Sequence, residues 1–187
     1  MNNKEIYIKL EKAVGDNNVQ EVSNILDQHS DLDLNDENLY TLHPPLCRAA
    51  KKGFYEICKT LIQYGADVNC IKDRLFSPLW GASSGNHLEI VKLLIENGAD
   101  INAYESSTTA ALNEAAAKGH FEIVRYLIEK GADINRLTTT LLFSPLDWSI
   151  SSGHNEISLF LKEKGASSNI NHDYVWSEVG AHCWLHR

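Results

Sequence analysis

The chain has 187 residues, 43% of them hydrophobic, and its 25 acidic residues outnumber 17 basic ones to give a formal net charge of -8. This composition excludes a mostly disordered chain, and the acidic balance argues against nucleic acid or an anionic membrane as a partner, because both require clustered lysine and arginine. No apolar run is long enough for a signal peptide or a membrane span, so we expect a cytoplasmic protein, or one delivered into a host cytosol without a cleavable signal.

The first predicted element is an N-terminal capping segment within residues 1–42. Its stretch LEKAVGDNNVQEVSNILDQ places Val22, Ile25 and Leu26 on one face of a helix, which indicates burial of that face. The glycine-alanine-aspartate ending that the later segments carry is lost here. We therefore expect this segment to close one end of a stack of related units.

A thirteen-residue string then occurs four times. The copies are ICKTLIQYGADVN from Ile57, IVKLLIENGADIN from Ile90, IVRYLIEKGADIN from Ile123 and the degraded ISLFLKEKGASSN from Ile157. Their glycines are 33, 33 and 34 residues apart (98-65, 131-98, 165-131), a period typical of stacked units. Each glycine is predicted to end a helix in the left-handed conformation, after which the chain leaves as an extended hairpin.

A second motif precedes each copy at the same phase, as HPPLCRAA, FSPLWGAS, TAALNEAA and FSPLDWSI. Ser77-Pro78 and Ser144-Pro145 predict helix starts, because the hydroxyl caps free backbone N–H groups and proline needs none. Asn86, Gly119 and Gly153 are predicted at the turn into the second helix. Ala110-Ala111 lacks both signals, so the first helix of that unit should be the loosest.

Together these motifs resemble the ankyrin repeat, whose pattern contains T-P-L-H-x-A-A, G-H-x-E-I-V and L-L-x-x-G-A-D-x-N. The resemblance covers about residues 43–170 and implies an all-α repeat solenoid of helix-turn-helix units joined by β-hairpin loops. A single domain over residues 1–187 is expected, with a cap, four repeats and a C-terminal half-repeat. The predicted boundaries are 1–42 for the cap, 43–75, 76–108, 109–142 and 143–170 for the repeats, and 171–187 for the half-repeat.

The resemblance implies a non-catalytic, monomeric scaffold that uses no cofactor or metal and binds a partner protein through a groove of loop tips and first helices. The candidate partner-binding residues occupy groove-facing or loop-tip positions: Arg48, Lys52, Phe76, Tyr104, Glu114, Lys118, Phe143 and Trp148. The aromatics among them predict anchors for a partner, and the basic residues an acidic partner segment. Alternatively, loop residues pack on one another to stiffen the loops, in particular Leu75, Phe76, Leu142 and Phe143.

The sequence departs from the family pattern at the histidine of T-P-L-H. The resemblance implies that this histidine ties the loops together, but the chain has Cys47, Trp80, Asn113 and Asp147 there. The usual hydrogen-bonded lattice is therefore in doubt, and Trp80 is expected to be wedged between repeats.

Two further hypotheses concern modification and metal binding. Resembling repeats are targets of an asparaginyl hydroxylase that requires a leucine eight residues before the asparagine, a spacing met by Asn69, Asn102 and Asn135. The same asparagines also serve the hairpin through their own hydrogen bonds. The alternative function is a metal-binding or enzymatic protein that uses the C-terminal tail, which contains His172, His182, Cys183 and His186. The four cysteines have no paired spacing and are expected to be reduced thiols.

Overall fold

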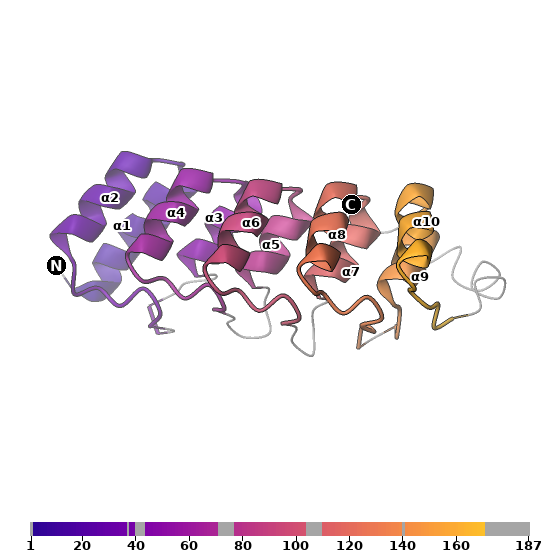
Figure 1. The fold of residues 1–187 in the computed structure, drawn as a ribbon. Helices are drawn as coiled ribbons and strands as arrows, with labels where there is room; N and C mark the ends of the chain where they lie inside the picture. Colours follow the sequence, from indigo (N-terminus) through magenta and orange to yellow (C-terminus); the bar gives the residue numbers. More distant parts are fainter. Residues whose placement is uncertain are drawn as a thin grey trace. The chain divides into compact units, whose positions relative to one another are not determined.

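The computed structural model describes residues 2–36, 38–39, 44–70, 77–103, 110–139 and 141–170. Those residues contain ten α-helices and no strand, and successive helices form helix-turn-helix pairs (Figure 1). The helices are α1 (Asn3–Gly15), α2 (Val19–Gln28), α3 (Pro45–Lys52), α4 (Tyr55–Gln63), α5 (Pro78–Ser84), α6 (Leu88–Glu96), α7 (Ala111–Lys118), α8 (Phe121–Glu129), α9 (Pro145–Ser151) and α10 (Asn155–Glu163). The predicted all-α architecture is confirmed, while the exact number of repeats stays a prediction.

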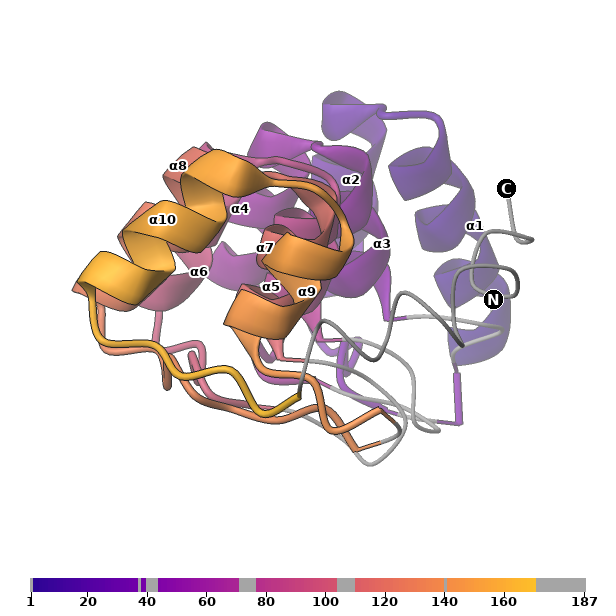
Figure 2. The ribbon, with the colours of Figure 1, turned by 90° about the vertical axis from the view of Figure 1, so that its right-hand side faces the viewer.

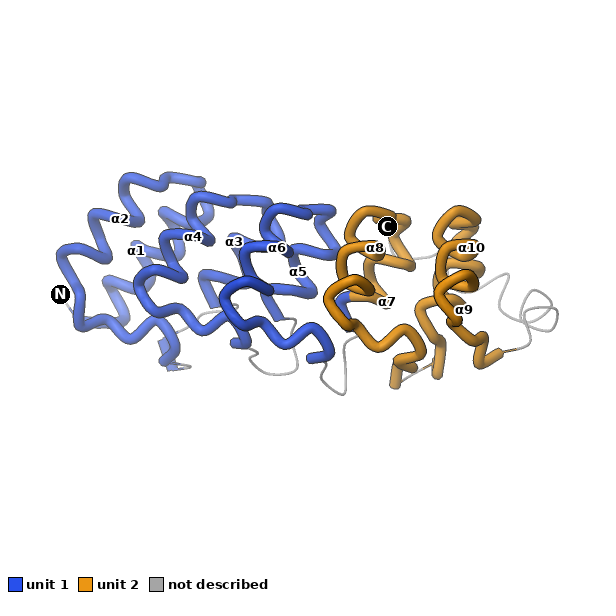
Figure 3. The backbone as a smooth tube through the Cα atoms, viewed as in Figure 1, with its two compact units in different colours: residues 1–111 blue, residues 112–187 orange. Residues whose placement is uncertain are grey.

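The chain divides into two compact units, residues 1–111 and 112–187 (Figure 3). Within the first unit, the first helices α1, α3 and α5 lie in one layer and the second helices α2, α4 and α6 in another (Figures 1 and 2). In the second unit α10 packs on both α9 and α8. The boundaries of the individual repeats stay predictions.

The helix starts and turns follow the sequence signals. The Ser77 Oγ accepts a hydrogen bond from the backbone N–H of Trp80 at 3.1 Å, and proline follows at the first helical position. The turn residues Asn86, Gly119 and Gly153 have positive φ angles of 61°, 79° and 77°. These predictions are confirmed, because each depends only on neighbours within one turn of helix.

The exit from the second helix differs from the expectation. Gly98 is left-handed, with a φ of 89°, as predicted. The next residues do not extend into a hairpin, because the backbone N–H of Asn102 donates to the Asp100 carboxylate at 2.9 Å and Ala103 N donates to Asp100 O at 3.2 Å. An aspartate that captures the N–H two residues on forms a compact turn. The tips of the predicted hairpins lie largely outside the described residues.

In the first unit the core lies between the two helices of each pair and between neighbouring pairs, where first helices pack on first helices and second helices on second helices. In α6 the side chains of Ile90, Val91 and Leu94 are buried, and α4 and α8 bury the equivalent residues. The same stripe in α2, Val22, Ile25 and Leu26, is buried as expected of a cap. None of the helices in the described ranges is long and apolar enough to cross a membrane.

Candidate protein-binding surface

Asparagines link each loop to the next within a unit. The Asn69 Nδ2 donates to Gly98 O at 3.0 Å, and its Oδ1 accepts from Asp100 N at 2.8 Å. In the second unit the Asn135 Oδ1 accepts from Ser167 N at 2.9 Å. The structural role predicted for these asparagines is therefore present for Asn69 and Asn135.

The N-terminal cap has the same link. The Asn35 Nδ2 donates to Gly65 O at 3.0 Å, and its Oδ1 accepts from Asp67 N at 2.8 Å. The backbone N–H of Asn35 donates to the Asp33 carboxylate at 2.8 Å, which forms the same compact turn as in the later repeats. The glycine and alanine of the later ending are absent here, as expected, but aspartate and asparagine keep the turn without them.

The residues that replace the T-P-L-H histidine still contact the loop of their own repeat. The Cys47 Sγ lies 3.6 Å from Cys70 O, and the Asn113 Nδ2 donates to Arg136 O at 2.9 Å. The doubt about the lattice is therefore resolved for these positions: other side chains make the bond. Trp80 is half-buried, and the ammonium of Lys51 lies 5.8 Å from its ring centroid.

Asp147 forms the most extensive of these connections. Its buried carboxylate accepts from Ser144 N at 2.8 Å, from the Ser168 Oγ at 2.6 Å and from Asn169 N at 3.1 Å. Burial raises the pKa of Asp147, but hydrogen bonds, first that from Ser168 and then those from Ser144 and Asn169, outweigh it and lower the pKa below the ordinary value. The charged carboxylate therefore joins the start of α9 to the segment after α10.

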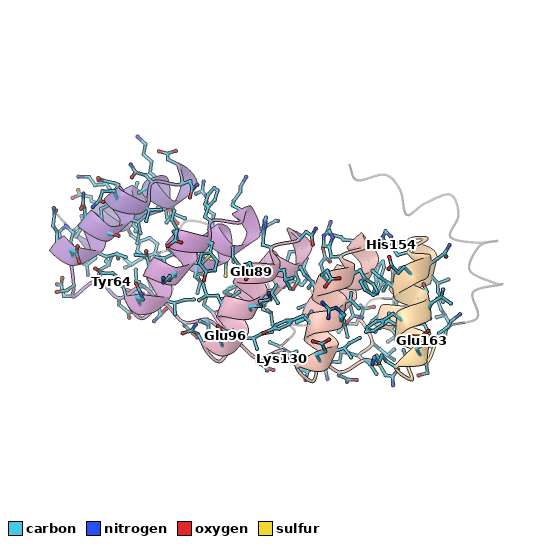
Figure 4. All side chains as sticks on the ribbon, turned by 45° about the horizontal axis from the view of Figure 1, so that its top comes forward. Tyr64, Glu89, Glu96, Lys130, His154 and Glu163 are labelled. Carbon is cyan, nitrogen blue, oxygen red and sulfur yellow. The ribbon has the colours of Figure 1, made fainter. Side chains whose placement is uncertain are left out.

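Histidines at the starts of second helices were missed by the sequence analysis. The His154 Nε2 lies 3.0 Å from Ala117 O, the carbonyl of a residue near the end of α7, and Figure 4 shows His154 at one end of α10. A Cβ on Gly119 would come within 2.6 Å of the His154 ring. In the first unit His87 approaches Lys51 O at 3.3 Å. A histidine recurring at 87, 120 and 154, beside the turn residue, was the signal available.

The charged candidates differ between the units. Arg48 and Lys52 are exposed on α3, and the Arg48 guanidinium lies so close to Gly15 that a Cβ there would come within 2.6 Å of it. On α7 the Lys118 ammonium lies 3.7 Å from the Glu114 carboxylate, whose side chain is only 15% exposed. The charges of α7 thus neutralise each other in part, whereas α3 presents net positive charge.

The aromatic candidates are also placed unequally. Phe143 is 8% exposed, and its ring centroid lies 5.1 Å from that of the half-buried Trp148. The expectation that Phe143 presents its ring at the surface is wrong, because the ring is buried and packs against Trp148. The Trp148 indole N–H has no hydrogen-bond partner among the described residues. Phe76 and Tyr104 lie outside the described residues.

A short apolar loop precedes α9, and we call its exposed side chains Leu137, Leu141 and Leu142 the leucine loop. Thr138 closes its base, since Thr138 N donates to Phe143 O at 2.9 Å and Phe143 N donates to the Thr138 Oγ1 at 3.1 Å. Leu142 is 54% exposed and has a φ of 54°, in the left-handed region. The alternative in which Leu75, Phe76, Leu142 and Phe143 pack on one another stays a prediction, because Leu75 and Phe76 lie outside the described residues.

No group of three histidine, cysteine or acidic side chains within the described ranges is arranged to hold a metal ion. The tail residues His172, His182, Cys183 and His186 of the alternative function lie outside those ranges.

Comparison with known proteins identifies the family. A family model described as ankyrin repeats (3 copies) matches residues 10–105 and 82–172. The chain belongs to the ankyrin repeat family. A curated protein of Rickettsia bellii (strain RML369-C), whose name describes it as an ankyrin repeat protein, is 39% identical over 67 residues. That match covers 34% of this chain and 39% of the relative, so the chain spans well under half of the relative's length. Ankyrin repeats are generally protein-protein interaction modules.

Proposed function

We propose that this ankyrin repeat protein is a non-catalytic scaffold that binds a partner protein through the leucine loop and Trp148 of the second unit. The observation that carries the proposal is Leu142, a large apolar side chain that is both exposed and attached to a left-handed backbone. A left-handed non-glycine residue costs about 1–3 kcal/mol and persists only where the surroundings impose it.

The surroundings do impose the conformation of Leu142. Its N–H donates to Thr138 O at 3.1 Å, and its carbonyl accepts from the Asn169 Nδ2 at 2.9 Å. These bonds involve only the backbone of Leu142, so glycine would make them equally well and without strain. Stacking of the repeats therefore does not require leucine at this position, which supports a role for its side chain in contacting another protein.

Trp148 extends this surface. It lies on a first helix, rests against Phe143 and keeps part of its ring accessible. Tryptophan held rigidly at a surface is a common anchor of protein interfaces, and the accessible part of the Trp148 side chain can serve as one.

In the first unit, the exposed Arg48 and Lys52 suit an acidic segment of the partner. Phe76, Tyr104, Glu114 and Lys118 stay candidate contacts. We propose a monomer that acts in the cytoplasm or in a host cytosol, and the buried free thiols of Cys47 and Cys58 are typical of such a reducing compartment.

The test compares stability and binding in one set of variants. The immobilised chain would capture partners from cytosol, and the captured protein would then be titrated against each variant. We expect Leu142→Gly to keep or raise the thermal midpoint while weakening affinity, because it removes strain and the apolar contact together. Trp148→Ala should weaken binding by about 1–3 kcal/mol.

The matched control is Leu159→Ala, which removes an equally apolar side chain, 63% exposed, from the second helix α10. It should leave affinity unchanged. Equal affinity of the wild type and Leu142→Gly for every captured protein would refute the proposed surface, as would an equal loss in Leu159→Ala.

A further inference from the structure

Two cysteines that are far apart in sequence have their sulfurs side by side in the first unit. Cys47 lies on the first helix α3, and Cys70 ends the compact turn that begins at Asp67. Their Sγ atoms are 3.5 Å apart, which is van der Waals contact for two thiols. The pair is separate from the leucine loop and Trp148 of the binding surface proposed above, which lie in the other unit.

The geometry permits a covalent bond with little movement. A disulfide has an S–S length of about 2.05 Å, so the sulfurs must approach by about 1.5 Å. Cys70 belongs to a half-buried turn outside any helix, and its chain is the more adjustable of the two. Cys47 is fully buried on α3 and holds its position.

We propose that Cys47 and Cys70 are a reversible oxidation site that closes to an intramolecular disulfide in the presence of a low-molecular-weight disulfide such as glutathione disulfide. The Cys70 thiolate attacks one sulfur of the oxidant, breaks its S–S bond and releases one glutathione thiolate. The Cys47 sulfur, after losing its proton to solvent, attacks the Cys70 Sγ and expels the second glutathione. Two protein thiols lose two electrons and two protons, and one glutathione disulfide is reduced to two thiols.

The order of attack follows from exposure. Cys70 is the more accessible sulfur, so a bulky oxidant reaches it first. Burial, and next the hydrogen bond with Cys70, raises the pKa of Cys47 well above its ordinary value, which makes this thiol a poor first nucleophile. Once Cys70 carries glutathione, the neighbouring Cys47 attacks within one molecule, where proximity compensates for its small thiolate fraction.

Oxidation would change a structural contact. In the reduced chain the Cys47 thiol lies 3.6 Å from Cys70 O, which is the loop contact that asparagine and aspartate make in the second unit. A disulfide replaces this weak hydrogen bond with a covalent link between α3 and the turn. The modification would thus stiffen the first unit next to the exposed Arg48.

The experiment treats the full-length reduced chain with glutathione disulfide, alkylates the remaining thiols and maps the peptides by mass spectrometry. The wild type should lose two alkylatable thiols, become lighter by two hydrogen atoms and yield a Cys47–Cys70 linked peptide. Cys47→Ser should instead stop at a glutathione adduct on Cys70. Below the pKa of Cys47, closure should accelerate about tenfold per pH unit, because the thiolate fraction rises by that factor.

Two controls separate this pair from the other thiols. Cys58 is buried with a pKa raised to about 12 by burial, so it should stay reduced throughout. A Cys183→Ser variant should close the bond as the wild type does, which excludes the fourth cysteine as the partner. Circular dichroism would confirm that Cys47→Ser is folded, and if it is not, the wild-type map alone decides. A stable glutathione adduct on wild-type Cys70, or a link to a different cysteine, would overturn the proposal.

Discussion

The two compact units make the same contact, from a first helix to the segment after the second helix, through different side chains. In the first unit Cys47 contacts the carbonyl of Cys70, 23 residues later, through a thiol. In the second unit Asn113 reaches 23 residues on with an amide, and Asp147 reaches 21 and 22 residues on with a carboxylate. The helix-pair geometry therefore decides where the contact lies, while the side chain decides its strength and what perturbs it. A thiol responds to oxidants, and a carboxylate responds to pH.

The strongest test of this comparison removes the two contacts separately. We expect Asp147→Ala to lower the free energy of unfolding by about 3 kcal/mol or more, because it leaves the buried Ser144 N–H without its acceptor and also removes the bonds from Ser168 and Asn169. Cys47→Ala should lower it by about 1–2 kcal/mol, since it removes one weak bond and a small volume. Urea denaturation followed by circular dichroism measures both. A larger loss in Cys47→Ala would reverse the ranking.

The links between neighbouring loops should be worth less than the contact of Asp147. Asn69→Ala removes the bonds to Gly98 O and Asp100 N, and we expect a loss of about 1–2 kcal/mol. Asn97→Ala is the matched control, because its exposed side chain bonds to Leu93 O one turn earlier and to nothing else among the described residues. That variant should change stability by less than about 0.5 kcal/mol. Equal losses in the two variants would show that Asn69 contributes only locally.

The pH dependence of stability should distinguish the carboxylate from the thiol. The pKa of Asp147 is lower in the folded chain than its ordinary value of 3.8, so the folded protein binds this proton less readily than the unfolded one. Its stabilising effect is complete above the unfolded pKa and is lost as pH falls through the lower folded pKa. The stability difference between the wild type and Asp147→Asn should therefore shrink from about pH 5 toward pH 3. A constant difference over that range would contradict this role.

The smallest expected effect is hydroxylation of Asn69, Asn102 and Asn135. The Asn69 and Asn135 side chains are hydrogen-bonded to the next loop, so an enzyme gains access only when the loops open. We expect slow, partial addition of oxygen by an asparaginyl hydroxylase, detected by intact mass. An unshifted mass after prolonged incubation would end this hypothesis.

The sequence by itself determined the features that depend on near neighbours. The helix start at Ser77, the left-handed Gly98 and the buried stripe of Ile90, Val91 and Leu94 follow from residues within one or two turns of helix. The repeat period then extended these local predictions over most of the chain, because each repeat has the same pattern of helix starts, turns and buried positions.

Only the tertiary structure decided which distant residues meet. Cys47 and Cys70 become a pair and Asp147 reaches Ser168, because the turn after the second helix folds back onto the first helix. The sequence spacing of 21–23 residues carries no helical or strand period that would reveal such contacts. The strained backbone of Leu142 was equally hidden, since leucine normally avoids the left-handed region and only the bonds to Thr138 and Asn169 hold it there.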